Sequence, residues 1–218
     1  MNQTKYQIAL LEEMVGKNLY QYCKGKLGEK AAEILNGHLE EDAVKWLQEE
    51  SQVYRKDNRD NIEFAKSLIL DKIILHWIKD YFYKIHRVEL ELNGCDKDKY
   101  LINHKVTCAP DFKLKGDEDI YIEEITNYTG FVKKTGALHL RATKGEYLKR
   151  LSKEKKVYLM VLDVPSRSYV LVPMTDELPM YHIEQLASFG GKSAYGLDIG
   201  DYPFIPLDDE RALKQWVA

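Results

Sequence analysis

The residues best suited to chemistry are two acids that a short hairpin would bring together. Asp111 precedes a turn signal at Lys115-Gly116-Asp117, and the residues from Asp119 to Asn127 predict a strand after that turn. Side chains alternate between the two faces of a strand, so Glu124 points to one face and Glu123 to the other. If the first arm begins at Asp111 and Glu124 points inward, the two carboxylates supply the hard oxygen ligands that Mg²⁺ prefers.

The choice between the two adjacent acids depends on strand register. A shift by one residue moves every side chain to the opposite face, which would make Glu123 the ligand in place of Glu124. Ile125 would then stand two residues beyond the acid, where Thr126 stands in the first register. Adjacent acids are also typical of an exposed edge strand with solvated carboxylates. We expect Glu124 to be the ligand and keep Glu123 as the alternative.

At these residues the chain resembles the PD-(D/E)xK nuclease superfamily, which includes restriction endonucleases, Holliday-junction resolvases and transposon end-cleaving subunits. Pro110-Asp111 matches the first motif, and Glu124-Ile125-Thr126 stands where the family has an acid, any residue and a lysine. The chain departs from the family at Thr126, which takes the place of the lysine. The resemblance extends from Asn61 to Met174 and implies metal-assisted hydrolysis of phosphodiester bonds in DNA.

The resemblance also implies a set of metal ligands. Asp111 and Glu124 would hold Mg²⁺, the backbone carbonyl of Ile125 would be a further ligand, and Glu63 would add a carboxylate to the metal shell. Glu63 has a second interpretation, because an acid in the first turn of a helix complements the positive end of the helix dipole. Where the family's lysine supplies positive charge, the Thr126 hydroxyl can only form hydrogen bonds.

A lysine from another segment is therefore expected to supply the missing charge. Lys144, at the head of a predicted helix, is the first candidate, and Lys134 and Lys133 follow. Lys133 to Lys156 is a stretch in which basic residues far outnumber acidic ones, and Arg141 belongs to it. Contact with DNA phosphates without catalysis is the alternative for these side chains. We therefore predict a DNA-binding set of Lys133, Lys134, Arg141 and Lys144.

The order of predicted elements favours an α/β fold of the restriction-endonuclease-like type, with a mixed β-sheet core flanked by helices. A helical subdomain over residues 1–55 precedes a nuclease-like core with a C-terminal extension over residues 56–218. An apolar helix from Ile62 to Tyr83 opens the core. The other predicted elements follow in chain order: strands at Arg87–Leu92, from His104, at Asp119–Asn127 and at Ala137–Ala142, a helix at Thr143–Ser152 capped by Thr143, and strands at Lys156–Val164 and Tyr169–Pro173.

The N-terminal helices have two interpretations. Short helices separated by breaks at Gly25 and Gly28 are typical of a helix-turn-helix that reads DNA. Few basic residues occur between Leu35 and Gln52, which favours a packing or dimerisation subdomain instead. The segment Phe189-Gly190-Gly191-Lys192-Ser193 lacks the glycine spacing of a phosphate-binding loop, so we expect a flexible loop there.

Composition excludes several classes of protein. A net charge of −3 over 218 residues argues against a protein that coats nucleic acid by bulk charge. No run of about 18 apolar residues is present to span a bilayer. The three cysteines are widely separated and include no CxxC, which indicates neither a disulfide framework nor a zinc site. Acidic residues near the N-terminus are atypical of a signal peptide, so we expect a cytoplasmic protein.

The residues and the resemblance together predict a Mg²⁺-dependent DNA endonuclease. A type II restriction endonuclease that cuts double-stranded DNA as a homodimer is the expected form, because cutting both strands requires two reaction sites. One alternative is a DNA repair or junction-resolving nuclease. The other is a catalytically inactive nuclease fold that binds DNA or assembles with partners. The threonine at position 126, where the family has its lysine, favours this alternative.

Overall fold

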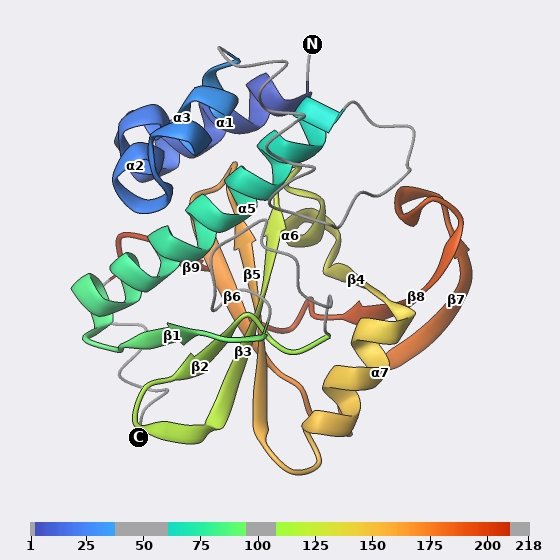
Figure 1. The fold of residues 1–218 in the computed structure, drawn as a ribbon. Helices are drawn as coiled ribbons and strands as arrows, with labels where there is room; N and C mark the ends of the chain where they lie inside the picture. Colours follow the sequence, from blue (N-terminus) through green and yellow to red (C-terminus); the bar gives the residue numbers. More distant parts are fainter. Residues whose placement is uncertain (1–2, 38–60, 95–107, 210–218) are drawn as a thin grey trace. The chain divides into compact units, whose positions relative to one another are not determined.

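The computed structural model describes residues 3–37, 61–94 and 108–209 of the chain, and it has a mixed α/β fold, as predicted (Figure 1). A six-stranded, mostly antiparallel sheet is accompanied by helices and by a three-stranded sheet. The described elements divide into two compact units. The first contains helices α1, α2, α3 and α5, and the second contains both sheets with helices α6 and α7. None of the described helices is long and apolar enough to cross a membrane.

The first unit is helical, and its elements are α1 (Gln3–Val15), α2 (Leu19–Leu27), α3 (Glu29–Asn36) and α5 (Asn61–Tyr81). Asn18 caps α2, because its side chain accepts a hydrogen bond from the backbone N–H of Gln21 at 3.1 Å. Gly37 ends α3 with φ +80°, a left-handed conformation that favours glycine. Gly28 separates α2 from α3 as predicted, but the predicted break at Gly25 is wrong, since α2 continues through it.

The predicted domain boundary at residues 55 and 56 lies outside the described residues. The sequence also predicts a third N-terminal helix through Ala43, Val44 and Leu47 and a polar linker from Ser51 to Asn61. The helix, most of the linker and the strand expected from His104 to Thr107 likewise lie outside the described residues. The helix-turn-helix interpretation depends on the first of these and stays a prediction. The apolar helix α5, expected to open the core, groups with the N-terminal helices, and a π-helical turn (Phe82–His86) continues it into the second unit.

The larger sheet has the strand order β1-β2-β3-β5-β6-β9. Its strands are β1 (Leu90–Leu92), β2 (Phe112–Leu114), β3 (Asp117–Asn127), β5 (Lys156–Asp163), β6 (Ser168–Pro173) and β9 (Ile205–Pro206). β3 and β5 pair in parallel and every other neighbouring pair is antiparallel. β5 is buried along most of its length because it is a central strand of the sheet.

The smaller sheet has the order β4-β8-β7 and is antiparallel throughout. Its strands are β4 (Ala137–Arg141), β7 (Met180–Leu186) and β8 (Lys192–Asp198). We predicted only β4. The segment interpreted as a flexible loop is the connection of the β7–β8 hairpin, where a short 3₁₀ turn (Ala187–Phe189) is followed by Gly190 and Gly191, both with positive φ.

Two helices connect the sheets: α6 (Phe131–Thr135) and α7 (Ala142–Leu151). The predicted N-cap at Thr143 is wrong, because the extended residue Arg141 ends β4 directly before the helix and no side chain caps it. α6 lies where we expected only a loop. A hydrophobic core joins the two helices to both sheets, and its members include Val132, Leu138, Leu140, Leu148, Leu159, Val161, Val170 and Leu197.

Candidate functional site

The β2–β3 hairpin places Asp111 beside Glu123. Phe112 lies opposite Ile122 in the antiparallel register, and one step further along that register Asp111 lies opposite Glu123. Directly opposed residues of an antiparallel pair point to the same face of the sheet. The backbone N–H of Glu124 donates a hydrogen bond to Asp111 Oδ2 at 2.7 Å, which fixes the Asp111 carboxylate at this edge of β3.

An irregularity in the hairpin decides which acid accompanies Asp111. Next to the turn, Leu114 lies opposite Asp117, and an uninterrupted continuation of this register would place Asp111 opposite Ile120, on the Glu124 face. The register instead shifts by three residues between Lys113 and Leu114. An odd shift exchanges the two faces.

Glu124 therefore does not occupy the predicted place on the face of Asp111, and Glu123 does. The carboxylate of Glu124 accepts a hydrogen bond from Thr126 Oγ1 at 2.7 Å, on the opposite face of β3. The register alternative considered from the sequence is the one that this strand adopts. In the family pattern the lysine stands two residues beyond the acid. Two residues beyond Glu123 is Ile125, and Thr126 instead stands two residues beyond Glu124.

Lys144 reaches the same place from the first turn of α7. Its ammonium Nζ lies 2.6 Å from Glu123 Oε2 in an ion pair and donates a hydrogen bond to the backbone carbonyl of Ala109 at 3.1 Å. Glu123 is only 7% exposed. Among the described residues no regular hydrogen bond reaches Oε2, so the close ion pair is its compensation for burial. Lys144 was the first candidate for the missing lysine, and the structure brings it to the acids.

Charge and burial shift the pKa values of this group. Burial raises the pKa of Glu123 well above its usual range, the nearby Asp111 carboxylate raises it further, and Lys144 opposes both effects. Burial lowers the pKa of Lys144, but the charges of Glu123 and Asp111 outweigh this effect and the pKa lies above its usual value. The site thus holds a stable ammonium and two carboxyl groups whose joint ionisation a further cation would favour.

The donor atoms at this edge suit a hard divalent cation. A residue in a strand directs its N–H and C=O to the same side, so the carbonyl of Glu124 faces the edge at which Asp111 binds. The carbonyl of Ile125, the predicted ligand, points toward β5 instead, and its side chain packs against the core. Asp111, Glu123 and the Glu124 carbonyl fit Mg²⁺, which keeps several waters and needs few protein ligands. In the described part of the chain, no three or more His, Cys, Asp or Glu residues gather into a larger metal cluster.

Glu63, the fourth predicted metal residue, lies on α5 in the first unit. Its carboxylate accepts hydrogen bonds from Thr4 Oγ1 and from Lys66 Nζ, the latter at 3.3 Å. Its place in the first turn of α5 fits the interpretation that it complements the helix dipole. A metal role for Glu63 stays a prediction.

The remaining predicted DNA-binding residues lie on α6 and at the end of β4. Lys133 donates hydrogen bonds to the hydroxyls of Ser166 and Ser168, both at 3.1 Å. Lys134 and Arg141 are exposed. Their contact with DNA stays a prediction, as does a catalytic role for Lys134.

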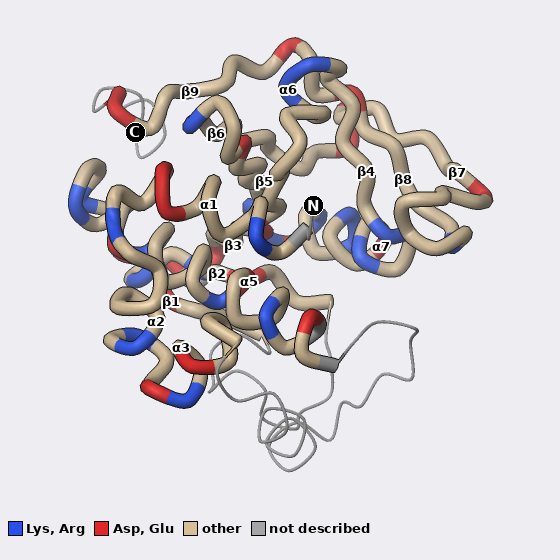
Figure 2. Tube along the Cα trace, turned by 90° about the horizontal axis from the view of Figure 1, so that it is seen from above, with Lys and Arg blue, Asp and Glu red and all other residues tan. Residues whose placement is uncertain are grey.

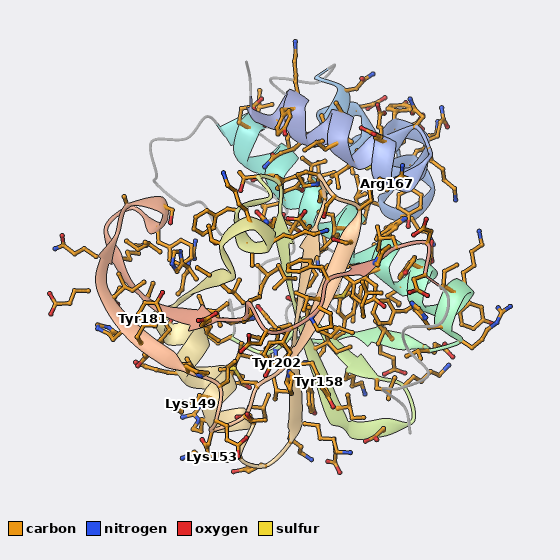
Figure 3. The ribbon with its side chains drawn as sticks, turned by 180° about the vertical axis from the view of Figure 1, so that it is seen from behind. Lys149, Lys153, Tyr158, Arg167, Tyr181 and Tyr202 are labelled. Atoms are coloured by element: carbon orange, nitrogen blue, oxygen red, sulfur yellow. The ribbon has the colours of Figure 1, made fainter. Side chains whose placement is uncertain are left out.

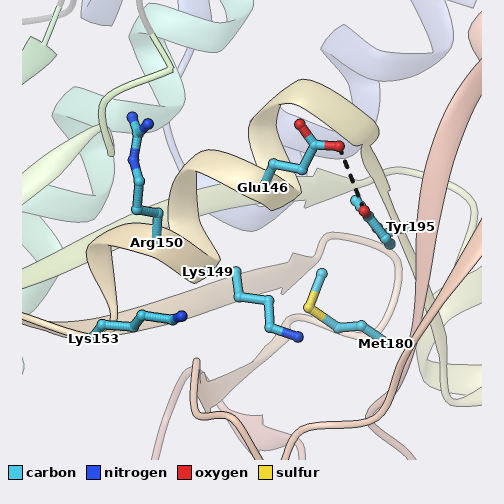
Figure 4. A pocket seen from close by; sticks show the side chains of 6 residues that line it. All are labelled: Glu146, Lys149, Arg150, Lys153, Met180 and Tyr195. Carbon is cyan, nitrogen blue, oxygen red and sulfur yellow. Dashed lines mark hydrogen bonds between the residues drawn. The ribbon is translucent and has the colours of Figure 1, made fainter.

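A pocket of about 270 Å³ on α7 was not predicted. It is lined by Glu146, Lys149, Arg150, Lys153, Met180 and Tyr195 (Figure 4). Lysine and arginine positions on α7 are blue along the trace in Figure 2, and Figure 3 labels Lys149 and Lys153. The hydroxyl of Tyr195 donates a hydrogen bond to Glu146 at 3.5 Å. Lys149, Arg150 and Lys153 have no ion-pair partner within the described residues. Glu146, Lys149 and Arg150 recur at helical spacing on one stripe of α7, and Lys153 lies in the turn that follows the helix. The periodicity of the sequence could therefore have revealed part of the pocket.

Comparison of the chain with protein-family models, with curated proteins and with solved structures finds no match. The assignment of function therefore rests on the residues of the site and on the short motifs around Asp111. Those residues supply two carboxyl groups, a backbone carbonyl and a half-buried ammonium at one edge of β3.

Proposed function

We propose that the protein is a Mg²⁺-dependent DNA endonuclease whose reaction site consists of Asp111, Glu123 and Lys144. The observation that carries the proposal is the buried ion pair between Glu123 and Lys144 beside Asp111. Burial of the Glu123 carboxylate is costly, so the pair contributes little to stability and is better explained by a role in the reaction. The resemblance to the PD-(D/E)xK nucleases supports it, since that family combines two acids on neighbouring strands with one lysine.

The acids of the chain would hold the metal. The backbone N–H of Glu124 orients Asp111, and the rigid strand β3 supports Glu123. A bound Mg²⁺ would supply the positive charge that neutralises the scissile phosphate and would lower the pKa of the attacking water. Because burial disfavours the ionised form of Glu123, its negative charge becomes more favourable when the metal is present.

Lys144 would act as a fixed positive charge. Its raised pKa keeps it protonated at neutral pH, so it donates hydrogen bonds and cannot accept the proton of a water. An ammonium held by Glu123 and by the Ala109 carbonyl is preorganised to stabilise negative charge that develops on a phosphate. Lys144 thereby supplies from a helix the charge that Thr126 cannot supply from the strand.

The proposal includes a restriction-endonuclease-like fold and, as its first form, a type II restriction enzyme in the cytoplasm. Double-stranded DNA would be the substrate and a homodimer the active form, because two sites are needed to cut two strands. The order of α5, β1, β2, β3, α7, β5 and β6 along the chain supports the fold. The parallel pairing of β3 with β5 supports it also, since this places α7 in the crossover between them.

The test is incubation of the full chain with long unmethylated duplex DNA, with Mg²⁺ or with EDTA, followed by gel analysis. We expect discrete fragments with Mg²⁺ and intact DNA with EDTA, and sequencing of the fragment ends would then give the recognition site. Branched DNA in a parallel reaction distinguishes a repair or junction-resolving nuclease. If neither substrate is cut with Mg²⁺ or Mn²⁺, the endonuclease proposal fails and an inactive DNA-binding fold replaces it.

A further inference from the structure

A row of aromatic side chains crosses the outer face of the β4-β8-β7 sheet. Gly196 of β8 lies directly opposite His139 of β4 on one side and Tyr181 of β7 on the other. Opposed residues share a face, so His139 and Tyr181 are on the same side of the sheet. The inner face is different, because it contributes Leu138 and Leu197 to the hydrophobic core.

Tyr181 lies across the backbone of Gly196. A Cβ atom at Gly196 would come within 2.2–2.6 Å of three atoms of the tyrosine ring and hydroxyl, so the ring occupies the space that a side chain would fill. Tyr181 is nevertheless 50% exposed. Figure 3 labels this side chain. An aromatic ring that rests on glycine on one side and remains half exposed offers a flat surface for stacking.

Phe131 extends the row beyond His139. The two ring centroids lie 6.0 Å apart, with 38° between their planes, and Phe131 is 44% exposed. Neighbouring strands are about 4.8 Å apart, so β7 and β4 are separated by about 10 Å across β8. This distance is of the order of three nucleotide steps at about 3.4 Å per step.

Positive charge accompanies the row. Arg141 lies two residues after His139 on the same face of β4, is exposed, and has no ion-pair partner within the part of the chain that the structure describes. Its guanidinium lies 6.0 Å from the Phe189 ring. An acid, Asp198 of β8, lies opposite Ala137 at the other end of β4 from Arg141. Its carboxylate accepts a hydrogen bond from the backbone N–H of Gly200.

We infer that this face binds unpaired nucleotides, with bases stacked on Tyr181, His139 and Phe131 and a backbone phosphate at Arg141. Exposed aromatic rings interleaved with cations fit single-stranded nucleic acid, because every base has a π-face that stacks. A duplex conceals those faces between its own base pairs. The choice of DNA as the nucleic acid rests on the proposed function, and the inference adds that the substrate includes a single-stranded segment.

The chain also connects this face to the reaction site. β4 ends at Arg141, and Lys144 lies in the first turn of the helix that follows directly. Lys144 is thus three residues along the chain from Arg141, the cation at which a backbone phosphate would bind. This substrate form favours the repair or junction-resolving alternative over cleavage of uninterrupted duplex.

The test measures DNA binding separately from cleavage. The full chain carrying Asp111→Asn is titrated in EDTA against fluorescently labelled oligothymidine and against a duplex of the same length. Tyr181→Ala and Phe131→Ala are then compared with Tyr83→Ala, a control at an aromatic residue of the second unit that is 57% exposed. Tyr181→Phe serves as the conservative variant, because it keeps the ring.

We expect tighter binding to the single strand, a loss of roughly 5- to 100-fold in that affinity for each alanine variant of the row, and little change for the other two variants. Thermal melting checks that the alanine variants remain folded. Equal loss in Tyr83→Ala, or no loss in Tyr181→Ala, would overturn the inference. The proposed function can fail separately. If wild-type protein binds the single strand but cuts no DNA with Mg²⁺, the proposed endonuclease activity is refuted, whereas single-strand binding by the aromatic face is supported.

Discussion

The two faces of helix α7 carry the same kind of side chain in opposite physical circumstances. Lys144 is half-buried, 2.6 Å from a buried glutamate, and hydrogen-bonded to a backbone carbonyl. Lys149 and Arg150 on the other face, and Lys153 in the turn that follows the helix, are exposed around a pocket and have no ion-pair partner among the described residues. A preorganised charge stabilises a transition state, whereas an exposed, solvated charge supplies mainly affinity for a polyanion. Under the proposed function, the face of α7 that carries Lys144 would take part in the chemistry, and the exposed face that carries Lys149 and Arg150 would bind phosphate.

Asp111→Asn should produce the largest effect, because it removes a proposed Mg²⁺ ligand from the site beside Glu123 and Lys144. The variant keeps the size of the side chain but loses the negative charge that Mg²⁺ requires. We expect the cleavage rate to fall by roughly 10³-fold or more, since a metal supplies several kcal/mol of transition-state stabilisation. Single-turnover cleavage measures the rate, and thermal melting checks the fold. A rate within a few-fold of wild type would remove Asp111 from the site.

Lys144→Gln compared with Lys149→Gln tests the two faces directly. We expect Lys144→Gln to reduce the cleavage rate by about 10²- to 10³-fold with little change in DNA affinity, because it removes preorganised charge. Lys149→Gln should leave the rate unchanged. Glu123 takes up a proton readily because burial raises its pKa, so loss of Lys144 should not unfold the chain. Equal losses of rate and affinity in Lys144→Gln would reduce it to a phosphate-binding residue.

Neutralisation of the cations around the α7 pocket should change the salt dependence of DNA binding more than it changes the cleavage rate. A variant with glutamine at Lys149, Arg150 and Lys153 can no longer neutralise the DNA phosphates that these side chains would bind. For each phosphate that is no longer neutralised, the slope of log affinity against log salt should fall by about 0.9 for duplex DNA or about 0.7 for a single strand. Fluorescence anisotropy at several salt concentrations measures the slope. An unchanged slope would show that the pocket does not bind DNA.

The smallest expected effect concerns the packing behind α7. Gly145 has no room for a side chain, because a Cβ there would lie 2.9 Å from the Tyr195 ring, whereas Gly25 in α2 has no atom within 4 Å of that position. Gly145→Ala should cost about 1–3 kcal/mol by overpacking, offset by about 1 kcal/mol of helix propensity. Gly25→Ala should stabilise by roughly 0.5–1 kcal/mol. Denaturant unfolding compares them, and a stabilised Gly145→Ala would contradict the close packing of α7 on β8.

The sequence predicted the central strands and the helix α7 because strong local signals specify them. The apolar run of β5 and the helix that follows Arg141 are present in the structure, and Lys144 was chosen for its position at the head of that helix. The choice of Glu123 over Glu124 could not be made from the sequence, because the three-residue shift at Lys113 and Leu114 arises from how the two strands pair.

The second sheet escaped prediction for a different reason. β7 carries mostly exposed side chains, so it lacks the apolar alternation that indicates a strand. The placement of Tyr181 over Gly196 depends on the cross-strand register, and no local pattern encodes it. α6 is a five-residue helix between Gly130 and Gly136, and glycines at this spacing are typical of a loop.

The most direct measurement compares Mg²⁺-dependent cleavage by Glu123→Gln with that by Glu124→Gln, because the two residues are adjacent and chemically identical. Glu123 shares the face of Asp111 and pairs with Lys144, whereas Glu124 serves through its backbone N–H, which the substitution keeps. We expect Glu123→Gln to lose cleavage by roughly 10³-fold and Glu124→Gln to stay within a few-fold of wild type. The reverse order, or equal activity in both variants, would contradict the assignment of the site.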